Sequence, residues 1–262
     1  MPFVIAICHQ KGGVAKTTTT LGLGASFVEH RSETLMIDLD PQANLTSSIG
    51  LDSGEMEHSI AEVLLGKADL AAVRLETSLP GLDIVPANAD MFSVSRELFQ
   101  LADYEYGLRR SLKSPAASDY EFVILDCPPS LGPLTLSALT AADLLIIPAQ
   151  CEYFSIQALT DMFAVVNLIR KKTNPQLVYR LLATMFDGRG NFHARMLERM
   201  RQYFKEGLLE TVIGFDTKLR EAQLAGQPVT IHSSQSRGAN QYRQLAEELY
   251  TYVSSKPQIQ TA

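Results

Sequence analysis

The sequence has little cysteine, and its cysteines show no spacing typical of metal ligands. Cys8, Cys127 and Cys151 lie in or beside apolar runs, and no Cys-x-x-Cys occurs. The small, odd number suits a reducing cytoplasm better than a disulfide-bonded secreted protein. We therefore expect three thiols buried in the core and a cytoplasmic location.

The sequence also lacks a long apolar run and an excess of basic charge. No run approaches the roughly 18 residues of a membrane-spanning helix, and no basic segment followed by an apolar stretch indicates a secretory signal. The formal net charge is −6, which argues against a surface that is basic overall and wraps nucleic acid. A local basic excess remains between residues 189 and 220, where seven Lys or Arg face four Asp or Glu.

Apolar strand-like runs alternate with helix-like periodic segments along the 262 residues. The expected strands cover 3–8, 34–39, 82–85, 121–126, 143–148, 178–185 and 210–213. The expected helices cover 17–29, 59–65, 90–100, 133–141, 156–171, 192–206 and 239–254. This β-α-β alternation predicts an α/β fold of the P-loop NTPase type, a doubly wound and mostly parallel sheet with helices on both faces. We expect one domain over 1–254, its least regular segment over 44–80, and a polar, frayed tail over 255–262.

A phosphate-binding turn follows the first expected strand. Gly12 and Gly13 let the backbone curl so that its N–H groups point at an anion. A helix beginning at about Thr17 adds free N–H groups and a positive dipole end. Lys16 is placed to reach the β- and γ-phosphates, and the Thr17 hydroxyl to bind Mg²⁺.

The turn departs from the ordinary Gly-x-x-x-x-Gly-Lys-Thr pattern. Its two glycine positions hold Gln10 and Ala15, and a second lysine, Lys11, stands ahead of the glycine pair. Two lysine ammonium groups, of Lys11 and Lys16, are then available to one triphosphate. We expect Ala15 to keep the turn only with a negative φ, and its methyl group has to clear the phosphate.

Acidic residues follow two other strands at the same expected edge of the sheet. Asp126 ends an apolar strand and precedes two prolines, which is where nucleotide hydrolases keep an acid that holds Mg²⁺, often through water. Asp38 and Asp40 end the second strand, and alternation places them on one side. One can tune the surroundings of the metal and the lysine, and the other can orient the attacking water.

These motifs together resemble the ParA/Soj family of partition ATPases, within the deviant-Walker-A group that includes MinD. The resemblance covers nearly the whole chain and rests on Lys11-Gly-Gly-Val-Ala-Lys-Thr-Thr, Asp38-Leu-Asp-Pro-Gln and Ile124-Leu-Asp-Cys-Pro-Pro-Ser. It implies ATP and Mg²⁺ as cofactors and an ATP-dependent homodimer in which Lys11 reaches the phosphates of the other subunit.

The resemblance also implies a role for each residue of the site. Lys16 serves its own nucleotide, and Asp40 lies by the metal and positions the hydrolytic water. Thr17 binds Mg²⁺ directly and Asp126 binds it through water. The remaining nucleotide contacts fall on Gly12, Gly13, Val14, Ala15, Thr18, Phe215 and Asp216. Gly214-Phe-Asp-Thr-Lys-Leu replaces the usual Pro-Arg-Asn-Val-Arg-Leu, which leaves the adenine contacts open.

The resemblance further implies non-specific DNA binding by the ATP dimer, through basic residues on the sheet's far side. Arg189 and Lys218 match two such positions, and Arg220 lies in the same basic stretch. A ParB-like partner or another cargo adaptor is implied to stimulate slow hydrolysis and release the protein from the nucleoid. The departures from the family pattern leave room for a cargo other than a chromosome or plasmid.

Three other functions are weighed against this one. A MinD-like membrane switch needs a basic amphipathic helix near the C-terminus, whereas residues 242–253 are amphipathic but acidic and favour packing on the sheet. An iron–sulfur ATPase needs paired cysteines, which are absent. A metabolic kinase needs an acceptor site, and none is recognisable.

Overall fold

A computed structural model describes residues 1–151 and 153–255. Its sheet has eight strands in the order β3-β4-β2-β5-β1-β6-β7-β8. All neighbouring strands are parallel except β3 and β4. The strands are β1 Phe3–Ile7, β2 Thr34–Asp38, β3 Leu75–Glu76, β4 Leu82–Val85, β5 Phe122–Asp126, β6 Leu144–Gln150, β7 Val178–Phe186 and β8 Leu208–Gly214.

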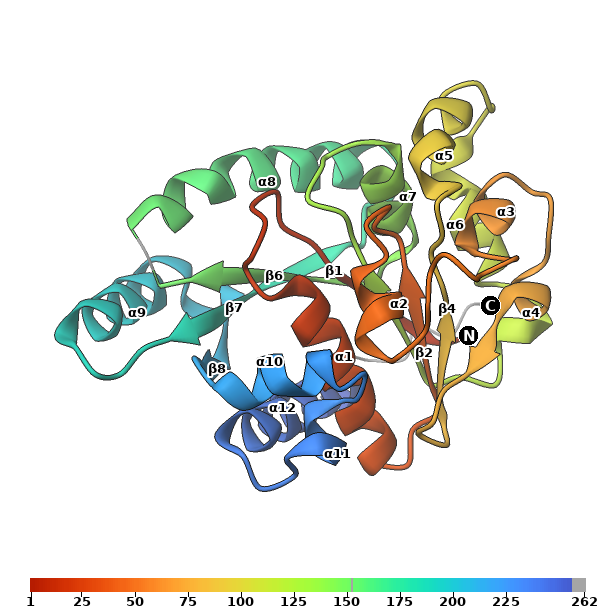
Figure 1. The fold of residues 1–262 in the computed structure, drawn as a ribbon. Helices are drawn as coiled ribbons and strands as arrows, with labels where there is room; N and C mark the ends of the chain where they lie inside the picture. The colour runs from red at the N-terminus through yellow and green to blue at the C-terminus, as the bar shows by residue number, and fades with distance from the viewer. Residues whose placement is uncertain (152, 256–262) are drawn as a thin grey trace.

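Helices cover both faces of this sheet (Figure 1), which confirms the predicted doubly wound α/β fold. One face carries α7 and α8, and the other carries α1 and α12. The α-helices of the described residues are α1 Lys16–Glu29, α2 Asn44–Ser48, α3 Ile60–Leu64, α4 Leu70–Val73, α5 Met91–Leu98, α6 Gly107–Ser111, α7 Pro133–Ala141, α8 Tyr153–Lys172, α9 Asn191–Phe204, α10 Thr217–Leu224, α11 Val229–His232 and α12 Arg237–Ser255.

The central strands are apolar on both sides because each side faces a separate core. Along β1, Val4 and Ala6 pack into the core between the sheet and α3 to α9. Ile5 and Ile7 pack into the core shared with α1, α10 and α12. A strand buried on both faces therefore reads as a continuous apolar run, which is the signal that made it predictable. The three cysteines are buried and free, as predicted.

Residues 44–80 contain more regular structure than expected. Besides α3, which matches the helix expected over 59–65, this stretch contains α2, α4 and the edge strand β3. Helix α3 was predictable from its capping box, in which the Ser59 hydroxyl and the Glu62 carboxylate each accept from a backbone N–H. The others span two to five residues, which is too short for a hydrophobic period. The expected frayed tail lies outside the described residues, Ser255 excepted.

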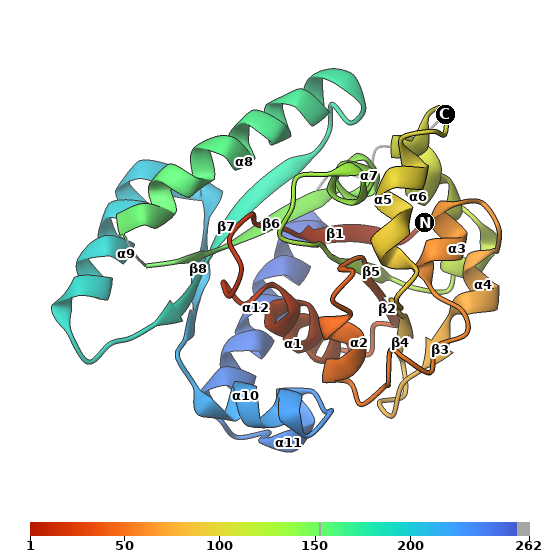
Figure 2. The ribbon, with the colours of Figure 1, turned by 45° about the horizontal axis from the view of Figure 1, so that its top comes forward.

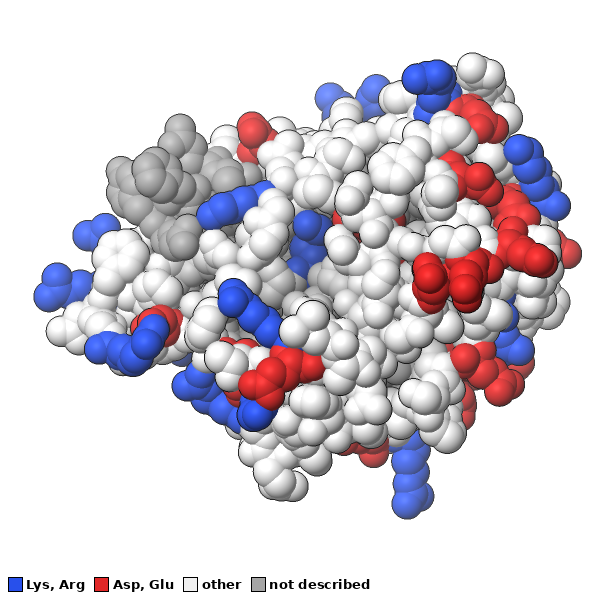
Figure 3. Space-filling view, viewed as in Figure 1, with Lys and Arg blue, Asp and Glu red and all other residues white. Residues whose placement is uncertain are grey.

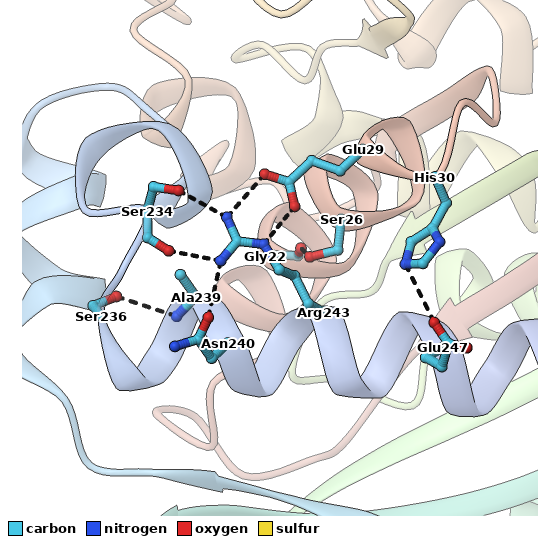
Figure 4. A network of polar contacts seen from close by, with 10 residues as sticks. All are labelled: Gly22, Ser26, Glu29, His30, Ser234, Ser236, Ala239, Asn240, Arg243 and Glu247. Atoms are coloured by element: carbon cyan, nitrogen blue, oxygen red, sulfur yellow. Dashed lines mark hydrogen bonds and ion pairs between the residues drawn. The ribbon is translucent and has the colours of Figure 1, made fainter.

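Helix α12 is fastened along α1. A Cβ atom on Gly22 would lie 2.5 Å from the ring of Tyr242, so the missing side chain allows the two helices to touch. The Arg243 guanidinium donates two hydrogen bonds to the Glu29 carboxylate, at 2.6 and 3.0 Å, and one to the Ser234 carbonyl at 2.6 Å (Figure 4). The P-loop helix is thus held by the last helix of the fold.

The apolar face of α12 is buried, as expected for a helix that packs on the sheet. Its fully buried side chains are Ala239, Tyr242, Leu245, Ala246 and Leu249. Among the residues that the structure describes, no helix is both long and apolar enough to span a bilayer.

Candidate active site

A cavity of about 410 Å³ opens at the carboxyl edge of the parallel strands. In an open α/β sheet this edge is where ligands bind, and the volume is within the usual range for a small-molecule site. Figure 2 shows α1, which the phosphate-binding turn enters, beside α2 and above α10. The described lining is Gly12, Gly13, Ala15, Lys16, Thr17, Thr18, Asp40, Gln42, Asn44, Ser48, Pro129, Met185, Ile213, Gly214, Phe215, Asp216, Leu219, Arg220 and Gln223.

The glycine pair forms an open cradle for an anion. No atom lies within 4 Å of where a Cβ would stand on Gly12 or Gly13, and Gly13 has a φ of +74°. Lys16 begins α1, is only 8% exposed, and faces the cavity. Backbone N–H groups, a helix N-terminus and a buried ammonium therefore converge on one volume, which is the arrangement that holds phosphates.

The expected conformation of Ala15 is wrong. Ala15 has a φ of 71° and a ψ of 34°, in the left-handed region, rather than a negative φ. Its carbonyl accepts the first helical hydrogen bond, from the Thr19 N–H at 2.9 Å. The chain must reverse here between the cradle and α1, so the residue keeps the glycine-like conformation although it carries a methyl group.

Two of the three predicted magnesium ligands contact each other: Thr17 lines the cavity, and the fully buried Asp126 lies behind it. The Thr17 hydroxyl donates to Asp126 at 2.7 Å, and the Thr20 hydroxyl donates to the other oxygen at 3.2 Å. Burial, followed by the charge of Asp38, raises the pKa of the Asp126 carboxyl. A divalent cation would offset this unfavourable charge. Oxygen donors and a surplus of buried negative charge therefore fit Mg²⁺.

The two acids after β2 have different surroundings. The Asp38 carboxylate is fully buried and accepts from the Thr46 N–H at 2.9 Å and its hydroxyl at 2.8 Å. Burial raises the pKa of Asp38. Asp40 instead lines the cavity, and its carboxylate accepts from the Gln42 N–H at 3.0 Å. Asp38 anchors α2, whereas Asp40 is the acid placed to meet a ligand.

The two lysines of the turn lie apart. Lys16 lines the cavity, whereas Lys11 is exposed and outside the described lining. The Lys11 ammonium donates to Oε1 of Gln150 at 3.1 Å. Its backbone N–H donates to Nδ1 of His9 at 2.8 Å. Burial, then the charges of Lys16 and Lys11, lowers the pKa of His9 to about 4, so the imidazole is a neutral acceptor that supports the turn.

Two further turn residues contribute in different ways. Val14 does not line the cavity, because its side chain is 1% exposed in the core and its carbonyl accepts from the Thr184 hydroxyl at 3.1 Å. Thr18 does line the cavity, and its hydroxyl accepts from the Gln223 amide at 3.1 Å. Gln223 was not expected, since α10 carries it from more than 200 residues away.

The far end of the cavity joins an aromatic ring to a cation. The Arg220 guanidinium carbon lies 5.1 Å from the centre of the Phe215 ring, and both side chains line the cavity. The Asp216 carboxylate accepts from the backbone N–H of Lys218 at 3.0 Å and of Gly238 at 2.9 Å. Asp216 therefore caps α10 and ties it to α12, while Phe215 and Arg220 offer a surface for a flat ligand.

The predicted DNA contacts are not on the sheet's far side. Arg189 follows β7 and Lys218 follows β8, so both lie at the carboxyl edge that carries the cavity, because these strands run parallel to β1. Each is exposed and ion-paired, Arg189 with Asp187 and Lys218 with Glu221, both at 2.6 Å. In Figure 3 basic side chains predominate at the α9 end and acidic ones over the side formed by α3 to α5.

Comparison with known proteins gives relatives over almost the whole chain. A family model described as an AAA domain matches residues 3–179. The sporulation initiation inhibitor protein Soj of Bacillus subtilis is 37% identical, over 94% of this chain and 97% of the relative. The chromosome partitioning protein ParA of Myxococcus xanthus is 38% identical, over 94% of this chain and 87% of the relative.

Solved structures share the fold. Cobyrinic acid a,c-diamide synthase from Mycobacterium smegmatis, with a bound ATP analog and magnesium, superposes with a TM-score of 0.86 at 34% identity, covering 97% of both chains. A plasmid partition protein of Borrelia burgdorferi bound to AMPPNP has a TM-score of 0.81 at 24% identity, covering 96% of this chain and 100% of that one. The latter supports the fold alone.

Proposed function

Because this chain belongs to the ParA/Soj family of partition ATPases, as its motifs predicted, we propose that it is an ATP- and Mg²⁺-dependent switch. The ATP-bound protein forms a homodimer that binds DNA without sequence preference. A ParB-like or other cargo-adaptor protein stimulates its slow hydrolysis of ATP and so releases it. The cycle acts in the cytoplasm, on the nucleoid in the ATP state, and positions a chromosome, plasmid or other cargo.

The residues of the cavity divide the work of hydrolysis. The Gly12 and Gly13 backbone and the Lys16 ammonium hold the phosphates. Thr17 would hold Mg²⁺ directly and Asp126 through water, and the cation would supply positive charge to the phosphates. Asp40 orients the attacking water at the mouth of the cavity. Phosphoryl transfer asks mainly for positioning and charge, so this set is sufficient for slow turnover.

The separation of the two lysines carries the proposal. Lys16 is buried and lines the cavity of its own subunit, whereas Lys11 is exposed and lies outside that lining. An ammonium outside the cavity can act on a triphosphate that a second subunit presents. Dimer formation is then coupled to ATP binding, and this coupling is what a nucleotide-dependent switch requires.

We assign the basic residues to two tasks. Arg189 and Lys218 contact DNA phosphates from the same edge of the sheet that carries the nucleotide. A change in the bound nucleotide can therefore alter their positions directly. Arg220, first expected to contact DNA, stacks with Phe215 at the far end of the cavity and serves the base of the nucleotide. Asp216 holds this end in place through its two backbone contacts.

Retention on non-specific DNA tests the switch. We expect strong retention with ATP, weak retention with ADP or no nucleotide, and a steep fall with salt, because phosphate contacts release counterions. Arg189→Glu and Lys218→Glu should weaken retention and leave ATP hydrolysis intact. Lys113→Glu, an exposed residue after α6, is the matched control and should change neither. Equal retention of the wild type in all three nucleotide states refutes the switch.

Two other functions fit less well. A MinD-like membrane switch needs an apolar helix face for lipid, and the apolar face of α12 is buried against α1 and β8; liposome co-sedimentation of the ATP form tests this. A diamide synthase, as the Mycobacterium smegmatis neighbour is named, needs a carboxylic acid substrate. ATP turnover by this protein without such a substrate would argue against that activity.

A further inference from the structure

Helices α2 and α10 form two walls of the cavity and lie beside each other (Figure 2). From α2, the cavity is lined by Asn44 and Ser48. From α10, it is lined by Leu219, Arg220 and Gln223. The separation of these two helices therefore sets how much room a nucleotide has between them.

Both helices end in the same motif, with a glycine in the left-handed region. The φ angle is +85° at Gly50, after α2, and +65° at Gly226, after α10. Each glycine N–H donates to the carbonyl three residues back, at 3.0 and 3.1 Å. The next N–H donates to the carbonyl five residues back, at 3.3 and 3.1 Å. These paired bonds are the Schellman motif, in which the residue after the helix cap takes a positive φ.

The two glycines pack backbone against backbone. A Cβ atom on Gly226 would lie 2.8 Å from the Cα atom of Gly50 and 3.0 Å from its nitrogen. Neither atom belongs to a side chain that could rotate away. A Cβ atom on Gly50 would meet only an ordinary contact, 3.5 Å from the Gly226 carbonyl oxygen. The missing side chain of Gly226 is therefore what lets the ends of α2 and α10 touch.

This contact is linked to groups at both ends of the cavity. The Asp40 carbonyl accepts from the N–H of Ala43, the residue that precedes α2, at 2.8 Å, so a shift of α2 displaces Asp40. Helix α10 carries Arg220 at the aromatic end, and the Gln223 amide donates to the Thr18 hydroxyl of the turn at 3.1 Å. A separation of α2 from α10 would thus pull apart the groups that surround a nucleotide.

We propose that the Gly50–Gly226 contact holds the cavity at the width that a nucleotide requires, and that Gly226 is a positioning residue for nucleotide binding and hydrolysis. The inference rests on the proposed function, in which ATP occupies this cavity and Asp40 orients the attacking water. Neither glycine touches the cavity lining. Both act through the helices that they terminate.

Gly226→Ala places a methyl group against the Gly50 backbone and forces the two walls apart. We expect the dissociation constant of ADP with Mg²⁺ to rise about tenfold, the size of one lost hydrogen bond to a charged group. Hydrolysis at saturating ATP should fall roughly ten- to a hundredfold, because a shift of about 1 Å in a positioned group has effects of that order. Isothermal titration calorimetry and phosphate release measure the two quantities.

Gly66→Ala is the matched control. Gly66 follows α3 in the same motif, with a φ of +69°, and no atom lies within 4 Å of where its Cβ would stand. The alanine there has the same backbone strain but nothing to push against. It should leave ADP binding and hydrolysis within about twofold of the wild type, which is below the effect of one hydrogen bond.

Gly226→Asn separates the added side chain from the backbone strain. Asparagine tolerates the left-handed region better than alanine does, yet it has a Cβ atom. It should therefore weaken ADP binding at least as much as Gly226→Ala while unfolding at higher urea. If Gly226→Ala does not fold, Gly226→Asn carries the test alone.

Hydrogen exchange reads the contact without any nucleotide. In the nucleotide-free protein, peptides covering 44–51 should exchange faster in Gly226→Ala and Gly226→Asn than in the wild type, because α2 loses the backbone against which it ends. Gly66→Ala should leave the exchange of these peptides unchanged.

The outcomes separate this inference from the proposed function. Weaker ADP binding and faster exchange over 44–51 in both Gly226 variants, with neither in Gly66→Ala, support the contact as a positioning device. Gly226 variants that match Gly66→Ala, or normal ADP binding restored by Gly226→Asn, overturn it and leave the proposed function standing. A wild-type protein that binds neither ADP nor ATP with Mg²⁺ overturns the proposed function itself.

Discussion

Ala15→Gly should stabilise the protein, although glycine substitutions usually destabilise. An L-residue in the left-handed region costs about 1–2 kcal/mol, which glycine does not incur. Glycine adds about 0.4–1 kcal/mol of conformational entropy to the unfolded chain. With φ at 71°, the net gain is about 0.5–1 kcal/mol. For a chain of this size that corresponds to roughly 1–4 °C in the unfolding midpoint.

An alanine inside α1, the helix that follows Ala15, gives the opposite expectation. Ala25 lies in the interior of α1 and is fully buried. Ala25→Gly loses about 1 kcal/mol of helix propensity and about 0.8 kcal/mol from the buried methyl group. Urea unfolding of the two variants without nucleotide should therefore shift in opposite directions from the wild type.

If Ala15→Gly unfolds at lower urea than the wild type, the left-handed conformation of Ala15 is not a source of strain and the reasoning fails. Repeating the titration with ADP and Mg²⁺ checks the site itself. The gain should persist, because Gly12 and Gly13 rather than the Ala15 methyl form the open cradle.

Three further predictions concern the surroundings of the cavity. Arg243→Ala removes the paired hydrogen bonds to Glu29 and should lower the free energy of unfolding by about 1–3 kcal/mol; Arg243→Lys should recover less than half in urea titrations, and an unchanged midpoint would contradict the clamp. His9→Asn keeps an acceptor for the turn but removes an imidazole whose folded pKa is about 4 against 6.5 unfolded. The unfolded state therefore binds more protons at this residue below pH 6.5. The free energy of unfolding of the wild type should therefore fall relative to that of the variant as the pH is lowered from 7.5 to 5. A difference that stays constant with pH would exclude the effect. Asp126→Asn removes a buried charge beside Asp38, so it should raise the thermal midpoint of unfolding in EDTA at pH 8. It should also reduce, at least tenfold, the gain in ATP affinity that Mg²⁺ provides. Equal Mg²⁺ dependence in variant and wild type would remove Asp126 from the metal site.

Much of the fold was predictable because its signals are local. The runs 82–85 and 133–141 coincide with β4 and α7, since the first is a largely apolar strand and the second begins at a proline. Asp126 and the turn from Lys11 to Thr18 were predictable for a similar reason. Each follows an apolar strand, and strands of a parallel sheet share one carboxyl edge.

What the sequence could not reveal depends on distant parts of the chain. Gln150 meets Lys11 across 139 residues, and no pattern near either residue announces the contact. The φ of Ala15 depends on how the cradle joins α1, which composition does not express. Arg220 lies in a basic stretch that favoured DNA, yet α10 turns it toward Phe215 and the cavity.

The attachment of α12 to α1 bears on how the protein is made. Arg243 and Glu29 are separated by 214 residues, so the helix that carries Lys16 leaves the ribosome long before the helix that covers it. At about 5–20 residues per second, the interval is on the order of 10–40 seconds. During that time α1 exposes the face that Tyr242 later fills. We therefore expect nascent chains to acquire nucleotide binding only once α12 has emerged, and chaperones to find their apolar target on α1 before then.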